Sequence, residues 1–158
     1  CYIFGEVQRI SPEAPVPVLL SKHLKSSLGG AGNVAQNLDS LNVRTFFISV
    51  IGDDTNGDNT LKHIKQLSKV EAQILRAKDH PSTTKTRLIS EGHYLLRYDQ
   101  EIKLSVSEGL IKELSKCLDL FLAKSKGIIL SDYDKGLLTE EITQTIIKKA
   151  NRQGLPIF

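Results

Sequence analysis

The chain has 158 residues, of which 40% are hydrophobic and 25% are charged, a balance typical of a globular domain with a real core. Its 21 basic and 18 acidic residues leave a net charge of +3, and no long block of one sign indicates a nucleic-acid or membrane partner. The two cysteines lack C-x-x-C spacing and the four histidines are far apart, which argues against a disulfide framework or a zinc site.

No targeting or membrane segment is visible. No apolar run approaches the roughly 20 residues of a membrane span, and no basic stretch followed by a hydrophobic one marks a secretory signal. We therefore expect a cytoplasmic protein. Because the chain contains no methionine and ends at Leu155–Phe158, where an apolar strand begins, we also expect it to be a fragment.

Two strand-like segments, Tyr2–Ile10 and Val16–Leu24, open the chain. The linker between them is stiffened by Pro12, Pro15 and Pro17, and proline is barred from helix interiors and central strands. We predict two edge strands that project from the main sheet as a flap. Their exposed apolar positions need a ligand or another subunit to cover them.

From residue 45 onward, short apolar runs alternate with amphipathic segments, the order typical of an α/β fold with a mainly parallel central sheet flanked by helices. The predicted elements are a strand over 45–51, a short helix after Gly57, a strand over 72–77, a hairpin of 84–90 with 94–98, a helix capped by Ser107, a buried strand over 127–130 and a helix capped by Thr139. We expect residues 1–28 to form a mainly β lid and residues 29–158 to form the first part of the α/β core.

The loops 52–57 and 132–136 follow predicted parallel strands, and ligands bind beyond the carboxyl ends of such strands. A third loop, Gly29-Gly30-Ala31-Gly32-Asn33, opens a helix, where glycines permit close ligand approach and free N–H groups attract anions or hydroxyl oxygens. Its spacing is neither that of a dinucleotide-binding loop nor that of a P-loop. A flexible linker before a helix is the alternative interpretation.

The order of these motifs resembles the PfkB family of ribokinase-like carbohydrate kinases. Residues 29–35 resemble the first family signature, and residues 52–57 resemble its G-x-D-x-x-G segment. Four further segments resemble the heptose 7-phosphate kinases of that family in particular: 9–18, which carries Arg9, Ser11 and Glu13 of the lid, 84–87, 96–99 and 130–136.

The resemblance implies ATP-dependent phosphorylation of the anomeric hydroxyl of D-glycero-D-manno-heptose 7-phosphate, on the route to the lipopolysaccharide inner core. It implies ATP and Mg²⁺ as cofactors, with sites mostly outside this chain. Because two flap strands could pair across a two-fold axis and cover exposed surface, we also expect a homodimer formed through the β lid. Gly29 and Gly30 would hinge the lid and Asn33 would hold sugar hydroxyls, although Asn33 would also suit a helix cap. The family's general-base aspartate and most of its ATP site are expected after Phe158, so no catalytic residue is named, and we expect the chain alone to be inactive in an assay of sugar-dependent ATP consumption.

Three cations, Lys85, Arg87 and Arg97, fall on neighbouring predicted strands. A substrate that already bears a phosphate requires such a cluster, since charge-assisted hydrogen bonds fix an anion better than neutral donors do. Cations on strands are also often simply solvated. Asp132 would orient a hydroxyl and Lys135 would meet phosphate charge, or the two would form an ion pair within a turn.

Several alternatives stay open. Asp53 and Asp54 would either contact substrate or cap the following helix. Another PfkB-type kinase, acting on ribose, fructose or a nucleoside, would have no need of the three converging cations. A hypothesis from a different functional class is a non-catalytic module that binds sugar or forms dimers.

Overall fold

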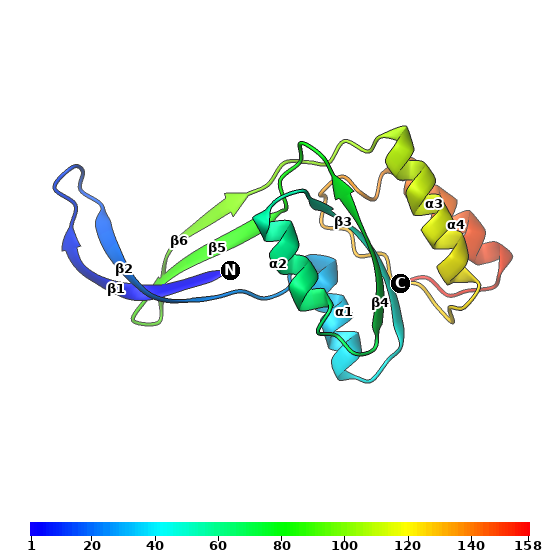
Figure 1. Ribbon diagram of the computed structural model, residues 1–158, viewed down its shortest axis with the longest axis horizontal. Coiled ribbons are helices and arrows are strands. Elements are labelled where there is room, and N and C mark those ends of the chain that lie inside the picture. The colour runs from blue at the N-terminus through cyan, green and yellow to red at the C-terminus, as the bar shows by residue number, and fades with distance from the viewer. The chain divides into compact units, whose positions relative to one another are not determined.

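The computed structural model describes all 158 residues and divides them into two compact units (Figure 1). The first, called the β unit below, consists of Cys1–Ser27 and Thr83–Glu101. The second, called the α/β unit, consists of Leu28–Ser82 and Ile102–Phe158 and contains all four helices. The chain therefore passes between the units three times.

The β unit is a four-stranded sheet in the order β2-β1-β5-β6. Strand β1 (Tyr2–Ile10) forms an antiparallel hairpin with β2 (Pro17–Lys25), and β5 (Thr84–Ser90) forms another with β6 (His93–Gln100). The first half of β1 also pairs in parallel with β5. The prediction that β1 is an edge strand is therefore wrong, because β1 has a neighbour on each side.

The second hairpin also shifts the boundary that the sequence indicated. Glu91 and Gly92 make its two-residue turn with φ angles of 50° and 79°, the left-handed geometry that matches the twist of a hairpin. The predicted hairpin is thus confirmed. It belongs to the β unit, however, and so the division differs from the expected lid of residues 1–28 alone.

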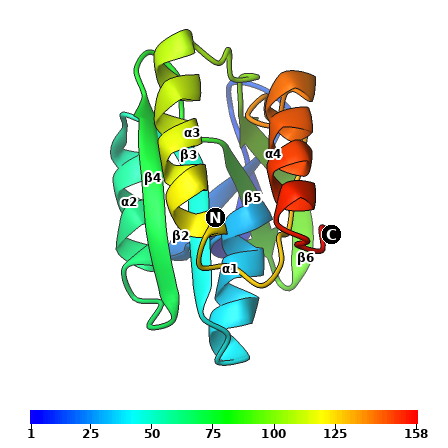
Figure 2. The ribbon, with the colours of Figure 1, turned by 90° about the vertical axis from the view of Figure 1, so that its right-hand side faces the viewer.

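The α/β unit is built on two parallel strands, β3 (Thr45–Gly52) and β4 (Val70–Ala77). Its helices are α1 (Gly30–Ser40), α2 (Thr55–Ile64), α3 (Glu108–Leu122) and α4 (Glu140–Arg152). Successive side chains of β3 point to opposite faces. Phe47 packs with Ala35 and Ile64 of α1 and α2, whereas the ring of Phe46 stacks on Phe121 of α3 at 4.7 Å. Figure 2 shows the backbone of α3 alongside β3. Both faces of β3 are therefore covered by helices.

The helix starts follow the sequence closely. Ser107 accepts a hydrogen bond from the Leu110 N–H and Thr139 from the Ile142 N–H, which confirms both predicted caps. Helix α2 begins earlier than predicted, at Thr55, so Gly57 lies inside its first turn. None of the helices is long and apolar enough to cross a membrane.

The prediction of a regular buried strand over 127–130 is wrong. Ile128 makes an isolated parallel bridge with Ile157, supported by three backbone hydrogen bonds of 2.9 Å, and Ile129 is 49% exposed. The apolar run is present in the sequence, but a regular strand also needs a hydrogen-bonded neighbouring strand along its length.

Candidate functional site

The glycine-rich loop opens α1 as the sequence indicated. Gly29 is the N-cap in an extended conformation, and Gly30 has a φ of 51°, which favours glycine. A Cβ placed on Gly30 would lie 3.4 Å from the Tyr133 ring. The loop after residue 130 is thus packed against the start of α1.

Asn33 lies one turn into α1, and its side chain is exposed. The N-cap position has no side-chain hydrogen bond, so the alternative that Asn33 caps the helix does not hold. Its amide carries both hydrogen-bond donors and an acceptor.

The loop of residues 131–136 is tightly folded. Asp132 accepts a hydrogen bond of 2.8 Å from the Asp134 N–H, and Gly136 packs on the backbone of Leu104, whose N–H donates to the Lys135 carbonyl at 2.9 Å. A pocket of about 450 Å³ is lined by this loop, by residues 103–105 and by the start of α4. An ion pair joins Lys103 to Asp134, and the hydrogen bond and charge of Lys103 lower the pKa of Asp134.

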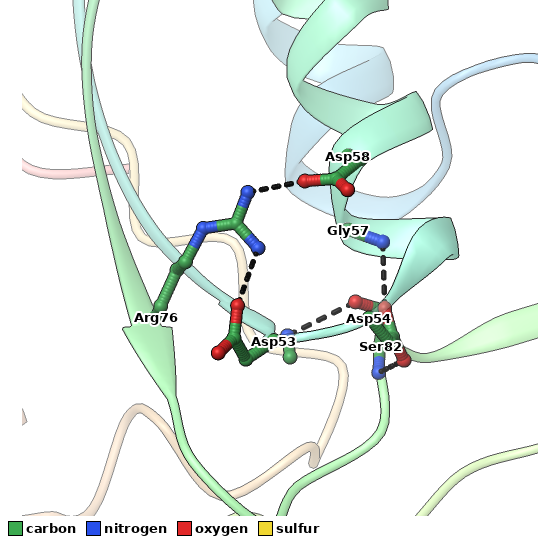
Figure 3. Close-up of polar contacts among 7 residues, drawn as sticks. Asp53, Asp54, Gly57, Asp58, Arg76 and Ser82 are labelled. Atoms are coloured by element: carbon green, nitrogen blue, oxygen red, sulfur yellow. Dashed lines mark hydrogen bonds and ion pairs between the residues drawn. The ribbon is translucent and has the colours of Figure 1, made fainter.

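Asp53 and Asp54 both make structural contacts (Figure 3). Asp54 caps α2 through a hydrogen bond of 2.7 Å from the Gly57 N–H, which confirms the capping interpretation for this residue. Asp53 instead forms an ion pair of 2.9 Å with Arg76, which also binds Asp58 at 2.5 Å.

The three predicted cations share one face of the β unit. Arg87 lies directly opposite Arg97 in the antiparallel register, and Lys85 lies opposite Asp99, so all four side chains point to the same side. The guanidinium of Arg87 lies 5.3 Å from the centroid of the Tyr2 ring. The prediction that the three cations fall on neighbouring strands is confirmed.

Two carboxylates partly neutralise these cations. Lys85 donates to Asp99 at 2.9 Å and to Glu101 at 3.0 Å, and these hydrogen bonds raise the pKa of Lys85. Arg97 Nε lies 3.0 Å from Asp99 Oδ1 without the alignment of a hydrogen bond. Sequence reasoning did not assign a role to Asp99 or Glu101, although the two-residue spacing of Arg97 and Asp99 already indicates a shared face.

The opposite face of the β unit carries an apolar row. The register aligns Leu24, Ile3, Leu88 and Leu96, one residue from each strand in a row across the sheet. Leu24 and Leu96, at the two ends, are 64% and 60% exposed.

The predicted lid residues lie on and beside the β1–β2 turn. The Ser11 hydroxyl accepts from the Glu13 N–H at 3.2 Å, and its backbone N–H donates to the Val16 carbonyl at 2.8 Å. Arg9 and Glu13 are exposed. The predicted residues are therefore divided between the units: the cations lie in the β unit, and Gly29, Gly30, Asn33, Asp132 and Lys135 lie in the α/β unit.

No group of three or more His, Cys, Asp and Glu side chains is arranged to hold a metal ion. None of these residues is assigned to a Mg²⁺ site.

Solved structures of carbohydrate kinases share this fold. A possible 1-phosphofructokinase from Thermotoga maritima superposes with a TM-score of 0.73 at 16% identity, over 99% of this chain and 48% of the other. Phosphofructokinase-2 from Escherichia coli, in complex with fructose-6-phosphate, gives 0.62 at 18% identity, over 99% and 50%. The fold is thus of the ribokinase-like α/β class.

The sequence comparison is more specific. The family model of the pfkB family carbohydrate kinases matches residues 2–153, and this chain belongs to that family. It is 42% identical over 151 residues to the bifunctional protein HldE of Helicobacter pylori strain G27, and 41% identical over 157 residues to that of Hyphomonas neptunium. The matches cover 96% and 99% of this chain, which spans about a third of the length of these relatives (33% and 32%).

Proposed function

We propose that this chain forms the sugar-binding part of an ATP-dependent kinase that phosphorylates the anomeric hydroxyl of D-glycero-D-manno-heptose 7-phosphate. The observation that carries the proposal is the cation face of the β unit, because three cations on one face suit a substrate that already bears a phosphate. The identity of 42% to HldE supports the heptose substrate over the sugars of other family members.

The roles follow from the chemistry of each group. The β unit acts as the lid, and Arg87 meets the 7-phosphate together with Lys85 and Arg97. Asn33 binds sugar hydroxyls, with Asp132 orienting a hydroxyl and Lys135 meeting phosphate charge. Phosphoryl transfer depends on positioning and on excluding water, which would otherwise hydrolyse ATP, and a lid meets both needs. No general base is assigned among these 158 residues.

Replacing the cations tests the substrate. In the full-length protein, Arg87→Gln should weaken heptose 7-phosphate binding by about 10- to 100-fold, because a hydrogen bond to a charged group contributes about 1.5–3 kcal/mol. Lys85→Gln and Arg97→Gln should weaken it less, since carboxylates already neutralise these two cations. Calorimetric titration measures all three.

Two controls make the result specific. Lys22→Gln removes another cation of the β unit, one paired with Glu6, and should leave affinity unchanged. Titration with the same heptose lacking its phosphate should show no difference between Arg87→Gln and the natural protein. Unchanged heptose 7-phosphate affinity in all three cation variants would contradict the substrate assignment and favour a ribose, fructose or nucleoside kinase.

We also propose that two copies pair through the lid. The supporting observation is the apolar row across the sheet, whose end residues Leu24 and Leu96 are exposed on the face opposite the cations. A second copy would cover this face while the cation face stays available to substrate.

A further inference from the structure

A buried serine marks the second passage of the chain between the units. Ser82 is the last residue of the α/β unit, Thr83 is the first of the returning β-unit segment, and β5 starts at Thr84. Ser82 is only 5% exposed, and buried polar groups are nearly always hydrogen-bonded. Its hydrogen-bond partners therefore define how the chain is held where it passes from the α/β unit to the β unit.

Ser82 is bound through both its side chain and its backbone (Figure 3). Its hydroxyl accepts a buried hydrogen bond of 2.9 Å from the Gly52 N–H. Its own N–H donates to one carboxylate oxygen of Asp54 at 2.8 Å, while the other oxygen caps α2 through Gly57. We call Gly52, Asp54, Gly57 and Ser82 the Ser82 clamp.

The two glycines of the clamp are required by close backbone approach. A Cβ on Gly52 would lie 2.2 Å from the His80 carbonyl oxygen and 2.6 Å from the Ser82 nitrogen. A Cβ on Gly57 would lie 2.4 Å from the Gly52 carbonyl oxygen and 3.0 Å from the Ser82 hydroxyl. All three fixed positions of the G-x-D-x-x-G segment thus serve to receive Ser82.

The third passage of the chain looks different. Glu101 and Ile102, which flank it, are both exposed. The first passage ends in Leu28, which packs in the apolar core. Only the passage at Ser82 combines a buried polar residue with a carboxylate that also starts a helix.

We propose that the Ser82 clamp is the fixed root of the lid, and that Asp54 and Ser82 are positioning residues for the cations of β5. Lys85 and Arg87 lie on β5, three and five residues beyond Ser82, so the place where the chain is held at Ser82 sets where these two cations begin along the strand. The inference rests on the proposed function in assuming that the β unit covers the sugar.

Hydrogen exchange of the full-length protein tests the clamp without any substrate. In Ser82→Ala the Gly52 amide loses its acceptor, so its exchange should become about tenfold faster. Asp53→Asn is the matched control, because it weakens the ion pair with Arg76 but no bond of the clamp. Equal exchange of the Gly52 amide in Ser82→Ala and the natural protein would overturn the proposal.

A kinetic ratio separates positioning from mere stability. We expect Ser82→Ala to raise sugar-independent ATP hydrolysis relative to sugar phosphorylation several-fold, whereas loss of folded protein would lower both together. Asp53→Asn should leave the ratio unchanged. A ratio in Ser82→Ala equal to that of Asp53→Asn would overturn the positioning role.

The outcomes distinguish this proposal from the proposed function. If the natural protein does not phosphorylate heptose 7-phosphate but the Gly52 amide responds to Ser82→Ala, the substrate is wrong and the clamp stands. If Ser82→Ala does not fold, exchange in the natural protein decides: the Gly52 and Ser82 amides should exchange far more slowly than those of Lys78 and Asp79, and comparable rates would refute the clamp.

Discussion

Gly29 and Gly30 are adjacent, yet the physical demands on them differ. Gly30 has a φ of 51° and faces the Tyr133 ring, while Gly29 has a φ of −126° and open space where a Cβ would lie. Conformational freedom is therefore needed at the second glycine alone.

This difference gives a matched pair of variants. Gly30→Ala should destabilise the full-length protein by about 1–2 kcal/mol, the cost of a left-handed conformation for an L-residue. Gly29→Ala should change stability little, because its backbone suits any residue. Urea denaturation of both variants measures the difference, and equal losses would contradict the argument.

Asp54 should make stability depend on pH. Burial opposes its ionisation most strongly, but the hydrogen bonds from Ser82 and Gly57 and the charge of Arg76 outweigh it and lower the pKa of Asp54 below its usual value of 3.8. A carboxylate whose pKa is lower in the folded than in the unfolded protein stabilises the fold at pH values above its unfolded pKa. This stability is lost as the pH falls through its folded pKa.

Asp54→Asn should therefore show a smaller loss of stability between about pH 5 and pH 2 than the natural protein does. Part of the loss should remain, since the pKa values of Glu6, Asp99 and Asp134 are also lowered by their cationic partners. Denaturation curves at several pH values measure this, and an unchanged pH dependence would contradict the role given to Asp54.

Helices α3 and α4 have their starts fixed by single hydroxyl groups. The Ser107 hydroxyl accepts from the Leu110 N–H at 3.3 Å, and Thr139 does the same for α4. These caps were predictable because a cap and the helix it starts are close neighbours in the sequence. The same holds for the β5–β6 turn at Glu91 and Gly92.

Removing one cap should be measurable. Ser107→Ala should cost about 1 kcal/mol, the typical effect of losing an N-cap side chain. Ser68→Ala, at an exposed turn position, serves as the control and should be close to neutral. Thermal unfolding measures this loss, and an equal shift in unfolding temperature for both variants would contradict the capping role of Ser107.

For the whole molecule, the two faces of the β-unit sheet differ in chemistry. One face carries the cations with Tyr2, and the other carries the aliphatic row that ends at Leu24 and Leu96. This division follows from strand alternation combined with the order β2-β1-β5-β6. It is the basis for assigning one face to substrate and the other to a second copy.

Charge on the apolar face should prevent pairing. Leu24→Glu with Leu96→Glu should convert the proposed dimer of the full-length protein to a monomer, since two carboxylates on each copy would be buried in the contact. Lys22→Glu on β2, which also adds negative charge, should leave the dimer intact. Sedimentation velocity measures the state, and a natural protein that is monomeric at all concentrations would refute the pairing.

The sequence by itself determined most of the elements, the caps, the hairpin and the family, because these signals lie within a few residues of each other or in the order of short motifs. Only the tertiary structure decided that β1 lies between β2 and β5, that Asp99 holds Lys85 and Arg97, and that Ser82 closes on Gly52 and Asp54. The reason is separation along the chain: the Ser82 contacts join residues 28 and 30 positions apart, and the Cys1 amino group bonds the Lys85 carbonyl across 84. No local pattern records which of many distant partners a residue will meet.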